Sequence, residues 1–175
     1  MLSEKFSVNS ELDHVRENFK TSNVLILTLG CSFSLIDSIT GLPVDKVSKK
    51  SVFDNPSVEE IKNNIIGILD VAKSYGYRRV FVTVSPVPLA GTLLYNGNPF
   101  ISDTVSKSKL RSAIDEVCFV EPSVTYFPSF EVFRQLSLHS FFPTLGLDDN
   151  YSRHVNEDMV NFIINKFLMQ NFLCA

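Results

Sequence analysis

Residues 23–34 read Asn-Val-Leu-Ile-Leu-Thr-Leu-Gly-Cys-Ser-Phe-Ser. The near-continuous apolar run up to Leu29 is typical of a parallel strand that is covered on both faces. Gly30 ends this strand, and Ser32 follows it directly. Ligands and catalytic groups gather at the carboxyl ends of strands in open α/β sheets. Ser32 can therefore be a nucleophile on a tight turn, a hydrogen-bond donor to an oxyanion, or the cap of the next element.

The rest of the chain alternates helices and strands. Ser57 and Glu60 form a capping box at the start of one amphipathic helix, and Gly76 is expected at its C-cap. We expect further helices over residues 11–20, 105–117, 130–136 and 156–172, and strands over residues 79–84 and 123–127. The segments that follow the first two strands, up to Ser57 and to about Asp103, are expected to be loops.

This alternation predicts an α/β fold with a parallel sheet. We expect a single domain over residues 1–175, with a helix within residues 1–22 and a core over residues 23–172. Three strands make a thin sheet, so we expect part of a larger fold to lie outside this chain.

Charge, hydropathy and cysteine spacing exclude some kinds of partner and favour a cellular location. The net charge is -3, from 16 basic and 19 acidic residues, and no basic stripe is present, so we expect no nucleic-acid partner. No apolar run approaches the roughly 18 residues of a membrane span, and the polar start predicts no signal peptide. Cys31, Cys118 and Cys174 lack metal-ligand spacing and are interpreted as reduced thiols of a cytoplasmic protein. We expect no metal and no other cofactor.

His154 is the best candidate for a general base. It lies at the end of a long loop and directly before the last expected helix. Asp149 and Asp148 stand five and six residues upstream, and a carboxylate bound to one imidazole nitrogen leaves the other free to accept a proton. The alternative interpretation is a helix cap beside a solvated acidic turn.

Three side chains near strand ends are candidates for a nucleophile. The full G-x-S-x-G pattern around Ser32 is absent, because position 34 is Ser. Cys31 is interpreted as a buried structural thiol, since no histidine is near it in sequence. Ser85 ends the second strand, and we interpret it as a turn residue ahead of Pro86.

Four stretches together resemble the GSCFA family, a branch of the SGNH (GDSL-like) hydrolase superfamily. They are Leu-Thr-Leu-Gly at 27–30, Thr-Val-Ser-Pro-Val-Pro-Leu at 83–89, Ser-Lys-Ser-Lys-Leu-Arg at 106–111, and Tyr-Phe-Pro-Ser-Phe-Glu at 126–131. Arg153-His154-Val155 also fits the family's C-terminal end. The resemblance implies a flavodoxin-like three-layer α/β/α sandwich. It also implies metal-free hydrolysis or transfer of ester and acyl groups, often on carbohydrates.

The resemblance implies two alignments for Ser32. In the first, Gly30 and Ser32 match the Gly and Asn of the superfamily's G-x-N-D turn, and Ser32 takes an oxyanion-hole position. The family's own Gly-Ser-Cys-Phe-Ala motif, which carries the nucleophile, would then lie upstream of Val24, where nothing resembles it. A rival alignment makes Ser32 the nucleophile but leaves too few strands before His154. The superfamily's terminal Asp-x-x-His is also altered, because Tyr151 stands where Asp is expected.

The resulting prediction is a serine hydrolase or acyltransferase that acts on a small-molecule or glycan ester. His154 is the base, and Asp149 orients it if the loop carries an insertion of two or three residues. Ser32 is the nucleophile or the oxyanion donor, and Gly30 and Ser85 complete the oxyanion or substrate-binding positions. The alternative is a truncated or degenerate, non-catalytic module that binds a glycan or a partner chain.

Overall fold

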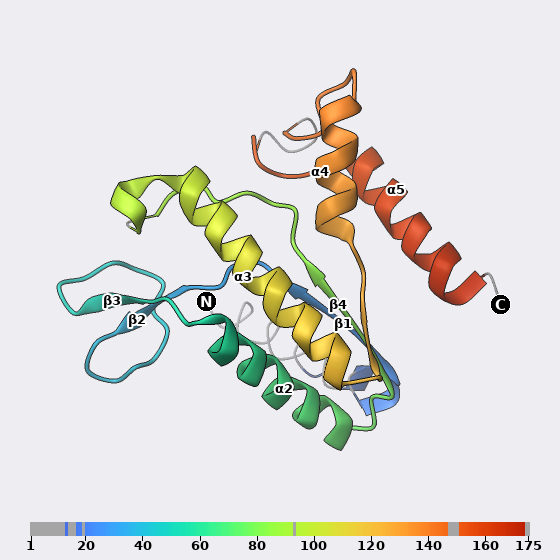
Figure 1. Ribbon diagram of the computed structural model, residues 1–175, viewed down its shortest axis with the longest axis horizontal. Helices are drawn as coiled ribbons and strands as arrows, with labels where there is room; N and C mark the ends of the chain where they lie inside the picture. Colours follow the sequence, from blue (N-terminus) through green and yellow to red (C-terminus); the bar gives the residue numbers. More distant parts are fainter. Residues whose placement is uncertain (1–12, 14–16, 19, 93, 147–150, 174–175) are drawn as a thin grey trace.

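A parallel sheet lies between two pairs of helices (Figure 1). The structure is a computed structural model, and it describes residues 13, 17–18, 20–92, 94–146 and 151–173. The helix expected over residues 11–20 therefore lies largely outside the described residues. The layers are those of an α/β/α sandwich, as the sequence predicts.

The sheet has the order β1-β4-β5, and its neighbouring strands run parallel. Its strands are β1 (Val24–Leu29), β4 (Arg79–Val84) and β5 (Val124–Tyr126). Leu29 pairs with Val84, so β1 and β4 end together at one carboxyl edge. Central β4 is buried after its first residue, whereas edge strand β1 leaves Ile26 55% exposed. The expectation that β1 is covered on both faces is thus wrong, because it stands at the edge of the sheet.

Helices α2 (Val58–Ser74) and α3 (Pro99–Val120) cover one face of the sheet. The predicted capping box is confirmed, because the Ser57 Oγ accepts from the Glu60 N–H while the Glu60 carboxylate accepts from the Ser57 N–H. Gly76 has the positive φ of a left-handed cap, +92°. The buried residues of these helices match the predicted apolar faces: Ile61, Ile65, Leu69 and Ala72 on α2, and Leu110, Ala113, Ile114 and Val117 on α3.

Helices α4 (Ser129–His139) and α5 (Glu157–Leu168) cover the opposite face, and α5 continues into a π-helical turn, η2 (Met169–Leu173). They pack around Phe81, whose side chain leaves β4 on the side opposite to Val80 and Val82. The Phe81 and Phe167 rings meet edge to face, with centroids 4.9 Å apart. The alternation of apolar side chains along β4 therefore joins two hydrophobic clusters.

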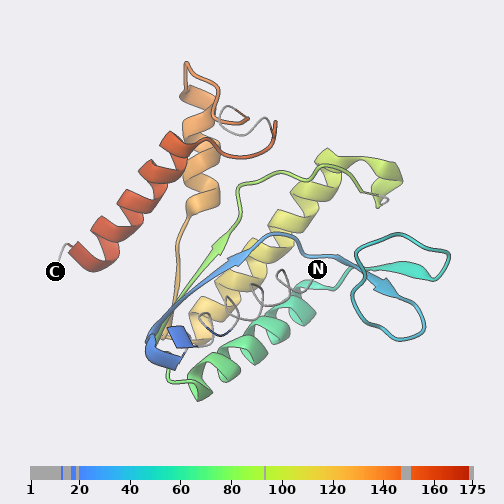
Figure 2. The ribbon, with the colours of Figure 1, turned by 180° about the vertical axis from the view of Figure 1, so that it is seen from behind.

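A β-hairpin occupies part of the first expected loop, so that expectation is wrong. It is formed by β2 (Ser34–Asp37) and β3 (Ser51–Asp54), which pair antiparallel. The Asp37 carboxylate accepts hydrogen bonds from the Ile39 and Thr40 N–H groups and so starts the turn. The hairpin projects away from α4 and α5, as Figures 1 and 2 show.

Helix α3 begins at Pro99, six residues earlier than expected. The Asn98 side chain accepts hydrogen bonds from the Phe100 and Ile101 N–H groups, and proline at the first helical position is compatible with a helix start. A short 3-10 turn, η1 (Tyr95–Gly97), precedes this cap. The early start places Asp103 and Thr104 on α3 instead of in a loop, which matters for the site below.

Candidate functional site

The turn of residues 30–32, at the carboxyl end of β1, is held by α3. The Ser32 N–H donates to the Ser106 Oγ at 2.7 Å, and the Ser106 hydroxyl contacts the Cys31 Sγ at 3.6 Å. The Lys107 Nζ donates to the Gly30 carbonyl oxygen at 2.6 Å. Ser106 and Lys107 are only 1% and 3% exposed. This pair fixes the path of the 30–32 turn from within the core.

Lys107 brings a positive charge under this turn. Burial lowers the pKa of its ammonium, while the charges of Asp103 and Cys31 act in the opposite direction. Asp103 stands one helical turn before Lys107 on α3, so the two lie on the same face of the helix. The Asp103 carboxylate also accepts a hydrogen bond from the Leu89 N–H at 3.1 Å. Through this contact, α3 holds both the 30–32 turn and the loop after β4.

Ser32 itself is buried beneath the turn, with 8% exposure. Its Oγ makes no hydrogen bond within the described part of the chain, and therefore none with His154. Its N–H is already used by Ser106. The turn leads into β2 and not into a helix, unlike the strand–turn–helix of a nucleophile elbow. The roles of Ser32 as nucleophile or oxyanion donor stay predictions.

Cys31 is exposed, so its interpretation as a buried structural thiol is wrong. The turn points Ser32 into the protein and leaves Gly30 and Cys31 on its outer side. Cys118 is part-buried, and burial raises the pKa of its thiol. Cys174 lies outside the described residues.

Ser85 closes the end of the sheet as a turn residue. Its N–H donates to the Leu29 carbonyl oxygen at 2.9 Å, which links the ends of β4 and β1. Its Oγ accepts from the Val87 N–H at 3.3 Å. This hydrogen bond is typical of a serine turn and fits the interpretation of Ser85 as a turn residue. A role in binding substrate stays a prediction.

Residues 151–155, the His154 segment, are tied to the same edge of the sheet. Leu145 and Val155 form an antiparallel bridge, and the Gly146 N–H donates to the His154 carbonyl oxygen at 2.8 Å. The Arg153 guanidinium donates to the Pro88 carbonyl oxygen at 2.8 Å. The imidazole of His154 is exposed and stacks on the Tyr151 ring, with centroids 5.0 Å apart.

The carboxylates predicted to orient His154 cannot be placed beside it. Asp148 and Asp149 lie outside the described residues. Their roles stay predictions. Within the described ranges, no group of three or more His, Cys, Asp or Glu side chains could hold a metal ion. In that same part of the chain, no helix is long and apolar enough to cross a membrane.

A cavity of about 260 Å³ lies between α3, α4 and the loop after β4. Its apolar lining includes Pro86, Pro88, Phe100, Phe130, Phe133 and Leu145. Asp103 and Thr104 line it from α3, one turn before the residues that hold the 30–32 turn. Pro88 and Leu145 are also the residues that bind Arg153 and Val155 on either side of His154. The cavity is therefore lined by neighbours of both predicted site segments, while Ser32 and His154 themselves do not line it.

The family model of the GSCFA family matches residues 3–167. This chain belongs to the GSCFA family. No curated protein and no solved structure matches it. The stretches by which the sequence resembles the GSCFA family have clear positions in the fold: the Ser106-Lys107 pair holds the 30–32 turn, and the stretch at 126–131 forms the contacts described next.

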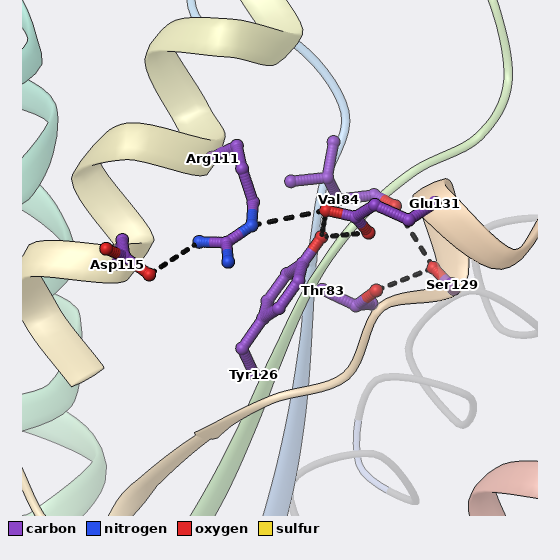
Figure 3. Close-up of polar contacts among 7 residues, drawn as sticks. All are labelled: Thr83, Val84, Arg111, Asp115, Tyr126, Ser129 and Glu131. Atoms are coloured by element: carbon purple, nitrogen blue, oxygen red, sulfur yellow. Dashed lines mark hydrogen bonds and ion pairs between the residues drawn. The ribbon is translucent and has the colours of Figure 1, made fainter. Parts of the chain in front are cut away.

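A polar network in this GSCFA-family chain joins the two helices that wall the cavity (Figure 3). Arg111 of α3 binds Glu131 of α4 at 3.2 Å, and it also binds Asp115 on its own helix. The Tyr126 hydroxyl donates to the Glu131 carboxylate at 2.7 Å, and the Arg111 guanidinium lies over the Tyr126 ring at 4.2 Å. Burial, and then the hydrogen bond to Glu131, raise the pKa of Tyr126.

A second contact in Figure 3 fixes the start of α4 to the end of β4. The Ser129 hydroxyl donates to the Val84 carbonyl oxygen at 3.1 Å, and it lies 2.6 Å from the Thr83 hydroxyl. Ser129 and Thr83 are both buried. Two polar anchors therefore set where α4 lies relative to the sheet and to α3.

The sequence does not reveal several residues that line the cavity or hold the segments near it. Asp103 was placed in a loop, although Asn98-Pro99 is a recognisable helix start that would have put it on the face of Lys107. Leu145 carries no local signal, and the contact of Arg153 with Pro88 joins residues that are 65 positions apart in the sequence. Lys107 stands out in the sequence only within the stretch that resembles the GSCFA family, and no local pattern predicts its burial.

Proposed function

We propose that this chain is a hydrolase or acyltransferase of the SGNH type that acts on an ester, with small-molecule and glycan esters as the substrate class. The observation that carries this proposal is the cavity after β4, whose lining residues Pro88 and Leu145 contact the His154 segment and whose lining residue Asp103 lies one helical turn before the residues that hold the 30–32 turn. It is apolar, has few polar groups, and lies at the carboxyl edge of a parallel sheet. These are the usual features and place of a small-molecule site in such folds.

His154 is the general base in this proposal. Its imidazole takes a proton from an attacking hydroxyl, whose oxygen forms a bond to the ester carbonyl carbon. When the tetrahedral intermediate collapses, the bond to the leaving oxygen breaks and this oxygen recovers the proton from His154. Exposure of the imidazole at the start of α5 supports this role, since the ring is accessible to substrate. Asp149 or Asp148 is proposed to orient it.

Ser32 stabilises the oxyanion in the version that we favour. Its Oγ is a buried hydroxyl that has no partner within the described residues, and an unsatisfied buried donor is unfavourable. A developing oxyanion would accept its hydrogen bond once the 30–32 turn opens toward the substrate, since Ser32 is buried and does not line the cavity. Removal of one such donor slows comparable hydrolases by about 10² to 10³. In this version the attacking hydroxyl belongs to a group other than Ser32, which can be water, an acceptor or another side chain.

The test is hydrolysis of p-nitrophenyl acetate and butyrate by the purified chain and three variants. We expect His154→Ala to lower kcat/KM by about 10² to 10⁴ and Ser32→Ala to lower it by about 10² to 10³. His139→Ala is the matched control, because His139 is exposed at the end of α4 and does not line this cavity. Absence of turnover by the wild type would contradict the proposal.

The nucleophile version of Ser32 has its own test. A fluorophosphonate forms a covalent adduct with an activated serine, and mass spectrometry locates the adduct. Labelling of Ser32 that is lost in His154→Ala would show that Ser32 is the nucleophile. Turnover by the wild type without labelling of Ser32 would support the oxyanion role.

A non-catalytic binding module is the second candidate function. Among the described strands β1 pairs on one side only, with β4, which favours this candidate because an open strand edge can accept another chain. A groove of about 520 Å³ runs beside this edge, lined by Leu25, Gly67, Ile68 and Val71 among others. Binding of a glycan or a partner chain by a wild type that shows no turnover would support this candidate over the hydrolase.

A further inference from the structure

The cavity contains one cation that is not neutralised by the described part of the chain. Arg134 lines it from α4 and is exposed. The Arg134 guanidinium lies over the Phe130 ring at 5.2 Å from the centroid. None of the described carboxylates forms an ion pair with Arg134. A contact with the face of the ring does not use the guanidinium N–H groups, so they stay available to solvent or a ligand.

Asp103, the acidic residue that lines the same cavity, already interacts with other groups of the protein. One Asp103 oxygen accepts the Leu89 N–H, and the Asp103 charge acts on Lys107. Arg134 is therefore the charged group of this cavity whose hydrogen-bonding atoms have no partner among the described residues, and we take it as the group that meets a ligand. Arginine is well suited to recognise carboxylate and phosphate groups, because its planar fork can donate two parallel hydrogen bonds.

The other residues that line the cavity limit the size and polarity of the rest of the ligand. Phe130, Phe133 and Leu145 give an apolar floor, and the volume of about 260 Å³ is just under the lower end of drug-sized sites, roughly 300 Å³. Such a space suits a short acyl chain or a single ring. A long acyl chain or a sugar polymer would have to extend outside.

We infer that this cavity binds a small anionic ligand with a short apolar body, and that Arg134 pairs with its carboxylate or phosphate. The inference rests on the proposed function, since it names the substrate class of the same site: a short-chain acyl ester that carries a negative charge. The anion can belong to the acyl part or to the alcohol part of the ester. In both cases a negatively charged group of the ester pairs with Arg134.

The test measures binding without turnover, by NMR titration of the full chain with hexanoate and with hexanamide. The two probes share their length and differ in charge. We expect saturable binding of hexanoate that is about fivefold tighter than that of hexanamide, as one accessible ion pair allows. Arg134→Gln should remove this difference. Arg78→Gln is the matched control, because Arg78 is exposed just before β4, at the amino end of that strand.

A second pair of variants tests the cavity itself. Thr104→Trp fills it from the exposed face of α3 and should weaken both probes at least about tenfold. Ser108→Trp, one helical turn further on and outside the cavity, should leave both affinities unchanged. Equal affinity for hexanoate and hexanamide, or an Arg134→Gln variant that still discriminates, would overturn the inference.

The outcomes separate the inference from the proposed function. A chain that binds hexanoate through Arg134 but hydrolyses no ester keeps this site and loses the hydrolase proposal. A chain that hydrolyses esters but does not distinguish the two probes keeps the hydrolase proposal and loses the anionic substrate class. To locate the anion, p-nitrophenyl hemisuccinate and p-nitrophenyl butyrate are compared. Preference for the hemisuccinate assigns the charge to the acyl part, and its absence beside tight hexanoate binding assigns it to the alcohol part.

Discussion

The two segments that carry the predicted site residues Ser32 and His154 are held in different ways. The 30–32 turn is held by the side chains of Ser106 and Lys107, which lie in the core. The His154 segment is held at the surface, by a backbone hydrogen bond from Gly146, a short bridge and the arginine Arg153. A change at the first should reduce the stability of the whole fold. A change at the second should displace the base locally while the fold persists.

Gly146→Ala is expected to give the largest effect, on activity. Gly146 has a φ of +73°, and an added Cβ would stand 2.9 Å from the Cα of Ser152. The His154 segment must therefore shift, and a misplacement of about 1 Å can slow catalysis about 10²-fold. Ester hydrolysis should fall by about this factor, with a much smaller change in Tm. Gly91→Ala is the control, because its added Cβ meets no atom within 4 Å. Equal losses in the two variants would break the comparison.

Ser106→Ala changes the 30–32 turn, and its effect should appear in the free energy of unfolding. It removes the acceptor of the Ser32 N–H in a buried place, and an orphaned buried donor costs about 1–3 kcal/mol. We expect the free energy of unfolding in urea to fall by about 2 kcal/mol. Ser108→Ala, which is exposed two residues further on, should stay within about 0.5 kcal/mol of the wild type. A Ser106→Ala protein as stable as this control would show that the turn is not held by α3.

Tyr126→Phe tests the network that sets the distance between the two walls. Loss of the hydrogen bonds to Glu131 should lower the free energy of unfolding by about 1 kcal/mol. Because the pKa of Tyr126 is raised in the folded protein, its stabilising contribution is complete below pH 10.0, its ordinary value, and is lost as the pH rises above it. Unfolding measured above pH 10.0 should thus depend less on pH in Tyr126→Phe. Tyr95→Phe, at an exposed tyrosine, should keep the pH dependence of the wild type.

Lys107→Met should give the smallest loss of stability in this series, and the effect that distinguishes it is a change in the pH dependence of unfolding. Burial lowers the pKa of Lys107, so the unfolded chain binds more protons between that lowered pKa and 10.5. The stability of the wild type relative to Lys107→Met should therefore rise with pH across this window. Unfolding of both proteins at several pH values checks the sign. Parallel curves would show that Lys107 has the same pKa folded and unfolded.

Local sequence patterns were sufficient for the layers of the fold. Apolar runs predicted β1 and β4, and helical spacing predicted the buried face of α2, because these signals depend on neighbours within one element. The β2–β3 hairpin was missed because each strand has only four residues, with Ser and Asp among them. Such short mixed segments look like loops.

The candidate site was predictable only in part. The sequence pointed to Ser32 and His154, since each stands where a strand or a loop ends. It could not show that Ser32 is buried, because that depends on Ser106, which is 74 residues away. Nor could it show the cavity, whose lining from Pro88, Arg134 and Leu145 is assembled by packing between separate elements.

The central claim is that the 30–32 turn and the His154 segment border one binding site. Its most direct test follows the backbone amide signals of Cys31, Ser32 and His154 by NMR while hexanoate is added. The account predicts that the signals of both segments shift and that their shifts fit a single Kd, while the signals of the distant β2–β3 hairpin do not move. Shifts confined to one segment, or different Kd values for the two, would contradict it.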